Sequence, residues 1–164
     1  MPDPFFADGP SDFLTLDQLR EMTGLQFMQK LVDGEVPTTT LARSLNYRVS
    51  KAEAGRVEVL GCPGHEQTNA FGGVHGGWYG AVLDTCMTCA IITGLPRGQY
   101  QTTLEYKINM IRAIPLGAEV IGIGEIDHLG RSTGVARGEI RGVQDGRLYA
   151  TGSATCFVMG APLD

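Results

Sequence analysis

The segment that most constrains the fold runs from Gly76 to Gly94 and reads GGWYGAVLDTCMTCAIITG. Apolar or small residues occupy every face of a helix built from it. The sequence therefore predicts a helix over residues 76–93 that is buried nearly all round. Gly94 and Pro96 predict where this helix ends. Because such a helix must be covered on all sides, we expect a sheet to wrap around it.

Asp84 is the only side chain of this segment that is formally charged at pH 7. Burying an ionised carboxylate costs several kcal/mol unless hydrogen bonds or an opposite charge offset it, and no basic residue lies three or four positions away. Asp84 therefore caps a second helix, is buried with its hydrogen bonds satisfied, or faces a functional site. No Gly or Pro near Leu83 breaks the helix, which favours a functional site.

Most of the remaining chain is predicted to form strands. Residues 103–110 alternate apolar and polar side chains, which predicts a strand with one dry face. Asp145-Gly146 is a strong signal for a two-residue hairpin turn. One long helix among strands predicts an α+β fold with a mostly antiparallel sheet. The other expected elements are a loose arm over residues 1–13, a packing helix over 15–32, two strands within 41–60, and strands over 118–127, 132–142 and 147–158.

Length and composition fit one globular domain. We predict an N-terminal arm and helix over residues 1–37 and the main domain over residues 38–164.

The net charge of −5, without any cluster of Lys or Arg, makes nucleic acid and anionic membrane poor partners. No stretch is apolar enough to predict a membrane span, and the N-terminus lacks the pattern of a signal peptide. We therefore expect a cytoplasmic protein.

The four cysteines are expected to be reduced thiols. Cys86 and Cys89 form a C-x-x-C motif, which is typical of redox chemistry or of a metal site. The pair lies inside the apolar helix and no second C-x-x-C exists, so we favour core packing. His65 and His128 have no companions at metal-ligand spacing, and we expect no metal.

Residues 69–77, NAFGGVHGG, lead into the helix. Glycines let the backbone approach a ligand closely, and the N–H groups at a helix start favour negative charge. The segment lacks the spacing of a Walker loop or of a dinucleotide-binding loop. These two loops bind phosphate groups. The other use of a glycine-rich helix start is an oxyanion hole, in which the Gly76 N–H stabilises charge on a carbonyl oxygen. His75 is either a general base or a residue that fixes the turn, and we favour the structural role.

Asn69, the run His75-Gly76-Gly77, and Asp84 nine residues beyond His75 resemble the signature of hotdog-fold thioesterases. The resemblance is to the PaaI-like acyl-CoA thioesterases, the phenylacetate-degradation type, and covers residues 40–158. It implies a hotdog fold, in which an antiparallel sheet wraps one long central helix. It also implies a homodimer or homotetramer, with each active site at a dimer interface and Asp84 facing the glycine-rich loop of the other subunit.

The same resemblance implies hydrolysis of an acyl-CoA thioester without a cofactor. Asp84 matches the family's general base or nucleophile, and Gly76 matches the residue whose N–H polarises the thioester carbonyl. Asn69 matches the asparagine that orients the substrate or water. Thr103 falls where relatives carry a hydroxyl near that water, and His75 completes the expected catalytic set.

Gly77, Trp78 and Tyr79 are the expected substrate-binding residues. Relatives more commonly carry smaller residues after the glycine pair. By the resemblance, the bulky Trp78 and Tyr79 are therefore expected to narrow the acyl pocket or to favour aromatic acyl groups.

Two other functions fit the same fold. A non-catalytic acyl-CoA-binding module of a regulator normally carries an appended pair of DNA-binding helices, whereas residues 1–37 predict one helix. An acyl-CoA dehydratase needs an Asp–His pair closely spaced in the central helix, and no histidine follows Asp84 there.

Overall fold

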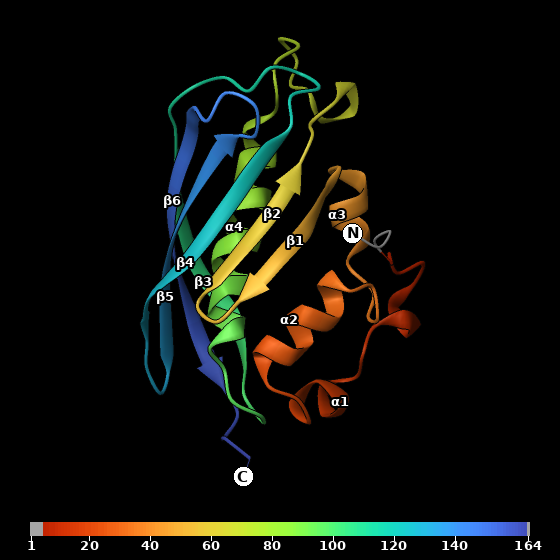
Figure 1. Cartoon of the computed structure of the whole chain (residues 1–164), viewed down its shortest axis with the longest axis vertical. Coiled ribbons are helices and arrows are strands. Elements are labelled where there is room, and N and C mark those ends of the chain that lie inside the picture. The colour runs from red at the N-terminus through yellow and green to blue at the C-terminus, as the bar shows by residue number, and fades with distance from the viewer. Residues whose placement is uncertain (1–4, 164) are drawn as a thin grey trace.

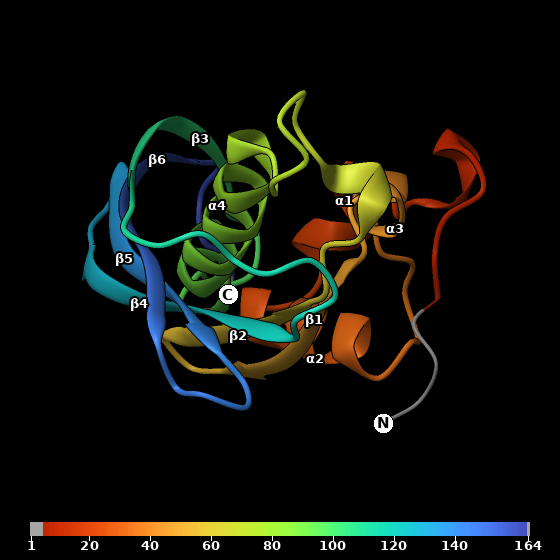
Figure 2. The ribbon, with the colours of Figure 1, turned by 90° about the horizontal axis from the view of Figure 1, so that it is seen from above.

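The computed structural model describes residues 5–163. These residues form one strongly curved sheet, a long helix inside the curve, and shorter helices at its open side (Figures 1 and 2). The helices are α1 (Leu16–Arg20), α2 (Gly24–Val32), α3 (Thr40–Ser44) and α4 (Gly76–Thr93), with short 3₁₀ turns at Pro10–Asp12 and His65–Gln67. The strands are β1 (Tyr47–Glu53), β2 (Arg56–Gly61), β3 (Tyr100–Met110), β4 (Val120–Leu129), β5 (Thr133–Gly142) and β6 (Leu148–Met159).

The six strands are ordered β1-β2-β4-β5-β6-β3, and all neighbours are antiparallel. Figure 2 shows the sheet bending around α4 so that its two edge strands, β1 and β3, lie on different sides of the helix. The predicted α+β fold, with an antiparallel sheet around one central helix, is confirmed. No helix in residues 5–163 is long and apolar enough to cross a membrane.

The central helix has the predicted bounds, and 11 of its 18 residues are buried. Glycines in the strands explain how the sheet approaches this helix so closely. A Cβ on Gly124 of β4 would lie 2.1 Å from the Cys86 carbonyl oxygen, and a Cβ on Gly138 of β5 would lie 2.7 Å from Cγ of Met87. These glycines therefore let β4 and β5 pack directly against α4.

The N-terminal region corrects two predictions. The single helix expected over residues 15–32 is wrong, because Thr15 and Thr23 each cap a separate helix, α1 and α2. A strand beginning near Leu41 is also wrong, because Thr39 caps α3 there and β1 begins only at Tyr47. In each case a threonine side chain accepts a backbone N–H and starts a helix that apolar spacing alone did not reveal.

The predicted loose arm is in fact attached over part of its length. Phe6 pairs with Thr38, and Ala7 is fully buried. The Arg43 guanidinium lies 5.2 Å from the centre of the Phe6 ring, within the range of a cation–π contact. Residues 1–4 of the expected arm lie outside the described residues.

The helix α2 packs against β1 and α4. The approach to α4 is close, since a Cβ on Gly24 would lie 1.7 Å from the Ile92 carbonyl oxygen. The division into residues 1–37 and 38–164 stays a prediction, but its N-terminal part contacts the central helix directly.

The hairpin of β5 and β6 is confirmed, while its two-residue turn is wrong. The strands end at Gly142 and begin again at Leu148, so the connection spans residues 143–147. The Gly146 N–H donates to the Gly142 carbonyl, and the Asp145 side chain accepts the Arg147 N–H. These bonds close a wider loop in place of a two-residue turn.

The edge strand β3 does not hide its apolar face within one chain. Leu104, Tyr106 and Met110 are 60%, 47% and 57% exposed. The predicted dry face is therefore wrong for an isolated subunit, because nothing in residues 5–163 covers these side chains. An exposed apolar edge strand is a surface that usually pairs with another chain.

Candidate active site

One face of α4 is not fully covered by the sheet. Its partly or fully exposed residues recur at helical spacing, which defines a surface that we call the open stripe. Polar side chains of the two edge strands reach this stripe from either side: Tyr47 of β1 hydrogen-bonds Thr85 over 3.1 Å, and Thr103 of β3 bonds Asp84. After Gly76 at the helix start, which is also partly exposed, the open stripe consists of Gly77, Ala81, Asp84, Thr85, Cys89 and Ile92.

Asp84 lies midway along the open stripe and is partly buried. Its Oδ1 accepts a hydrogen bond of 3.3 Å from the Thr103 hydroxyl. Within residues 5–163, no salt bridge offsets its charge. Removal from water raises the pKa of the Asp84 carboxyl above its ordinary value, and the bond from Thr103 offsets part of that rise. Such a carboxylate is a stronger base than one in water.

Thr103 reaches Asp84 because β3 is irregular at this point. The pairing with β6 shifts register between Thr103 and Glu105. A bulge of this kind redirects a side chain, here toward α4. The structure therefore brings together two residues of the expected catalytic set, Asp84 and Thr103.

His75 caps the start of α4. Its Nδ1 accepts the Gly77 N–H over 2.9 Å. This is the contact expected of the structural role, and a role as general base stays a prediction. Gly76 occupies the first helical position, where a backbone N–H has no acceptor within the helix. That N–H is suited to an oxyanion.

Asn69 shapes the loop that precedes His75. Its Oδ1 accepts the N–H groups of Phe71 and Gly73, at 2.9 and 3.2 Å. Its backbone N–H donates to the Gly73 carbonyl, which closes the turn. Within one chain Asn69 therefore holds the glycine-rich loop, and an orienting role toward substrate or water stays a prediction.

Trp78 and Tyr79 are core residues in this chain. Trp78 is 1% exposed and donates its indole N–H to the Leu45 carbonyl over 2.7 Å. Tyr79 is 4% exposed, and its hydroxyl accepts the Ile114 N–H over 2.8 Å. Both rings serve packing within one chain, and their predicted contact with an acyl group stays a prediction. Gly77, by contrast, is exposed on the open stripe.

The expected oxyanion donor and the expected base are far apart within one chain. Gly76 and Asp84 are separated by eight residues of α4, which corresponds to about 12 Å at 1.5 Å per residue. A single thioester carbonyl cannot contact both groups of the same subunit. One chain therefore carries two halves of the expected site that do not meet.

Tyr47 and Thr85 are site-lining residues that the sequence reasoning missed. Thr85 follows Asp84 directly, and its place on the helix face could have revealed it. Tyr47 could not be found this way, because only the curvature of the sheet brings β1 to the open stripe. Cys89 lies near Tyr47 on the same stripe. Burial is the main cause, and the charge of Asp84 the second, that raises the pKa of the Cys89 thiol to about 12.

The cysteines behave as packing residues. Cys86 and Cys89 are free thiols, and burial holds the pKa of the Cys86 thiol far above its ordinary range. A thiol of this kind is unreactive, because the thiolate is the nucleophile. Among the described residues, no group of His, Cys, Asp or Glu could hold a metal ion.

Comparisons with known proteins agree with this architecture. The model of the thioesterase superfamily matches residues 71–149. A hypothetical thioesterase of Streptococcus pneumoniae TIGR4, solved with coenzyme A, is 29% identical, covers 72% of this chain and 92% of its own, and superposes with a TM-score of 0.64. A Streptococcus mutans UA159 protein bound to acetyl CoA is 25% identical, with coverage of 72% and 92% and a TM-score of 0.65.

A third similar structure is a mutant of the phenylacetic acid degradation protein PaaI from Thermus thermophilus. It is 25% identical, covers 71% of this chain and 96% of its own, and has a TM-score of 0.65. A search of curated proteins found no match.

Fold, family match and structural neighbours together define the class: residues 71–149 match the thioesterase superfamily, and the chain has the hotdog fold of its thioesterase neighbours. It is a thioester hydrolase. Within that class it is PaaI-like, as the sequence motif predicted.

Proposed function

We propose that this protein hydrolyses acyl-CoA thioesters to a free acid and CoA, with Asp84 as general base or nucleophile. The observation that carries the proposal is the environment of Asp84. It is a carboxylate on the open stripe of an otherwise apolar helix, with a raised pKa, a hydroxyl beside it and no cation to neutralise it among the described residues. The coenzyme A and acetyl CoA bound to the two streptococcal neighbours support CoA as the carrier.

The chemistry needs few groups. Asp84 either removes a proton from a water that attacks the carbonyl carbon, or attacks that carbon itself. The Thr103 hydroxyl donates to the carboxylate and fixes its orientation. As negative charge develops on the carbonyl oxygen, a Gly76 N–H stabilises it, and such donors typically contribute about 3–4 kcal/mol. The CoA thiolate then leaves without needing much protonation.

Two copies of the chain are needed for this arrangement. Because Gly76 and Asp84 of one subunit lie about 12 Å apart, the oxyanion donor comes from a second subunit. The exposed edge of β3, with the side chains of Tyr106 and Met110, is the surface through which the copies pair. We propose a homodimer or a homotetramer built from such dimers.

The deciding experiment compares Asp84→Asn with Asp127→Asn. Asp127 is an exposed carboxylate on β4 that pairs with Arg137. Asp84→Asn is expected to lower kcat about 10²–10⁴-fold, because a neutral amide cannot act as base or nucleophile. Thiol release from a panel of acyl-CoAs, followed colorimetrically, measures the rates.

Asp127→Asn is expected to match the parent. If Asp84→Asn hydrolyses every acyl-CoA within threefold of the parent rate, Asp84 is not the catalytic carboxylate. If the parent binds acyl-CoA and releases no thiol, the protein is a binding module and the proposed function is wrong.

A further inference from the structure

A groove of 220 Å³ lies where the N-terminal helices meet the C-terminal end of α4. Residues of α1 and α2 and the segment between them form one wall, and the start of β3 forms the other. Among the described residues, no charged side chain lines it. The main apolar lining residues are Leu16, Leu19, Met22, Phe27, Ile92 and Leu95.

The groove shares elements with the candidate active site. Ile92 belongs both to the groove and to the open stripe, which also carries Asp84. On β3, Gln101 lines the groove, and Thr103 two residues later bonds Asp84. Side chains two residues apart point to the same face of a strand, so the β3 wall of the groove extends toward the catalytic carboxylate.

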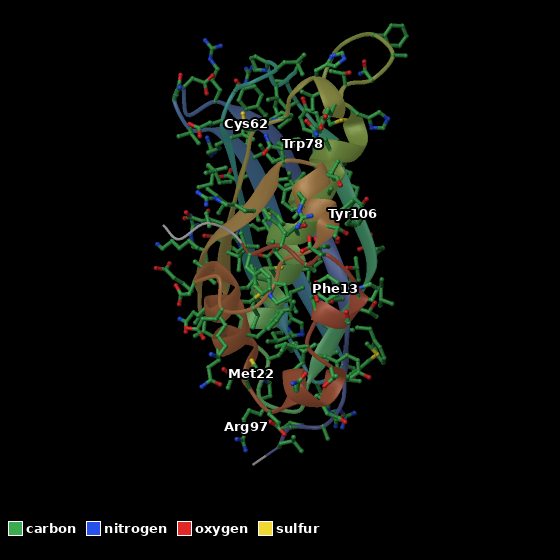
Figure 3. All side chains as sticks on the ribbon, turned by 90° about the vertical axis from the view of Figure 1, so that its right-hand side faces the viewer. Phe13, Met22, Cys62, Trp78, Arg97 and Tyr106 are labelled. Atoms are coloured by element: carbon green, nitrogen blue, oxygen red, sulfur yellow. The ribbon has the colours of Figure 1, made fainter. Side chains whose placement is uncertain are left out.

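In the opposite direction, side chains of β3 lie close against α4 beside the open stripe. A Cβ on Gly80 would lie 3.2 Å from the Tyr106 hydroxyl oxygen, and a Cβ on Gly76 would lie 3.4 Å from the Met110 sulfur. Figure 3 places Tyr106 well above Met22, which lies at the lower end of the molecule near the groove. Toward the C-terminal end of α4, by contrast, the apolar groove is open to a substituent on a carbonyl carbon at Asp84.

We propose that this groove binds the apolar tail of a medium-chain acyl group, an inference that rests on the proposed thioesterase function. Asp84 and Ile92 are eight helical residues apart, about 12 Å, which is the length of an extended medium-chain acyl group. At 220 Å³ the groove is smaller than the ~300–1,000 Å³ of a site for a whole ligand, so it fits a tail and excludes a nucleotide.

Substitutions that fill the groove with a larger side chain test this assignment. Leu16→Trp and Met22→Trp fill it, and Leu116→Trp is the matched control, because Leu16 and Leu116 are both 45% exposed and only Leu16 lines the groove. The measurement is kcat/KM for acetyl-, butanoyl-, octanoyl- and decanoyl-CoA. In the parent we expect kcat/KM to rise toward decanoyl-CoA.

Each groove variant is expected to lower the ratio of kcat/KM for decanoyl-CoA to that for acetyl-CoA about tenfold, the effect of one or two methylenes displaced from an apolar site. The control keeps the parent ratio. A parent that does not distinguish the chain lengths, or groove variants with the parent ratio, overturns the groove assignment and leaves thioester hydrolysis in place.

The absence of thiol release from every acyl-CoA refutes the proposed function instead. Calorimetry with S-decyl-CoA, a thioether that cannot be hydrolysed, then tests the groove without turnover. Leu16→Trp is expected to weaken its binding about tenfold relative to Leu116→Trp. Equal binding by the two variants overturns the inference.

Discussion

Asp84 holds its charge beside the Thr103 hydroxyl and beside thiols whose own pKa values are raised by burial. Its folded-state pKa is raised, so the folded protein retains this proton to a higher pH than the unfolded chain does. Ionisation of Asp84 therefore favours the unfolded state as pH rises through the folded pKa. The same ionisation creates the base that hydrolysis needs.

Activity and stability should consequently have opposite pH dependences. We expect kcat/KM to rise with pH through the raised pKa of Asp84, while the melting temperature of the parent falls relative to that of Asp84→Asn as pH rises toward the same pKa. Asp84→Asn removes the ionisation and should melt above the parent near neutral pH. Calorimetric melting of parent and variant across pH checks this. A variant that melts lower than the parent at neutral pH contradicts the unfavourable burial of this charge.

For single residues, the sequence located the charged side chain of Asp84 but not the side chains that surround it. Asp84 could be found because it is a lone acid in an apolar helix. The burial of Trp78 could not, because it depends on Gly61 of β2, where a Cβ would lie 2.9 Å from the indole ring. On an all-apolar helix, the strand that packs against a side chain decides which way that side chain points.

The element that organises the molecule is α4, and its start depends on one side chain. His75 accepts the Gly77 N–H, and loss of such a cap typically costs about 1 kcal/mol. We expect His75→Ala to lower the melting temperature by about 2–4 °C, and His75→Asn to restore it, because asparagine is a strong helix cap.

Turnover in the same two variants separates a cap from a general base. A structural His75 predicts that His75→Asn keeps the parent kcat. Equal loss of kcat in the alanine and asparagine variants, with the asparagine variant as stable as the parent, assigns the imidazole a chemical role instead.

Elements differed in how well their sequences predicted them. The central helix was predicted correctly because a long apolar run between Gly76 and Gly94 has few other solutions. The N-terminal helices were not, since the apolar spacing continues across Thr23 without a break. The signal that could have separated α1 from α2 is the pair of capping boxes, Thr15 with Gln18 and Thr23 with Gln26.

For the whole molecule, the prediction is that each site draws on two chains. Gly76→Pro removes the oxyanion donor, and proline is tolerated at the first position of a helix. Gly76→Pro and Asp84→Asn should each be nearly inactive alone. Mixed after dissociation and reassociation, they should recover about a quarter of the parent activity, since half of the dimers are hybrids and each hybrid has one intact site.

The mixture is measured by thiol release after the two variants are unfolded and refolded together. A control that mixes each variant with itself should stay inactive. If the mixture gains nothing while hybrid dimers are shown to form by native mass spectrometry, both groups act within one chain and the proposed arrangement is wrong.

The quaternary arrangement was expected from the family resemblance and from no pattern in the residues alone. The alternation of β3 predicted a dry face without indicating what covers it. The separation of Gly76 from Asp84 also follows from helix geometry, once both are placed on the same element.

That separation has a consequence for the life of the protein in a cell. In the proposed two-chain arrangement, a newly made chain is catalytically incomplete however well it has folded, so acyl-CoA is not hydrolysed until enough copies have accumulated to pair. The concentration of the protein then controls its activity. The hydrolytic rate rises more steeply than the number of chains, and dilution lowers the activity without any inhibitor.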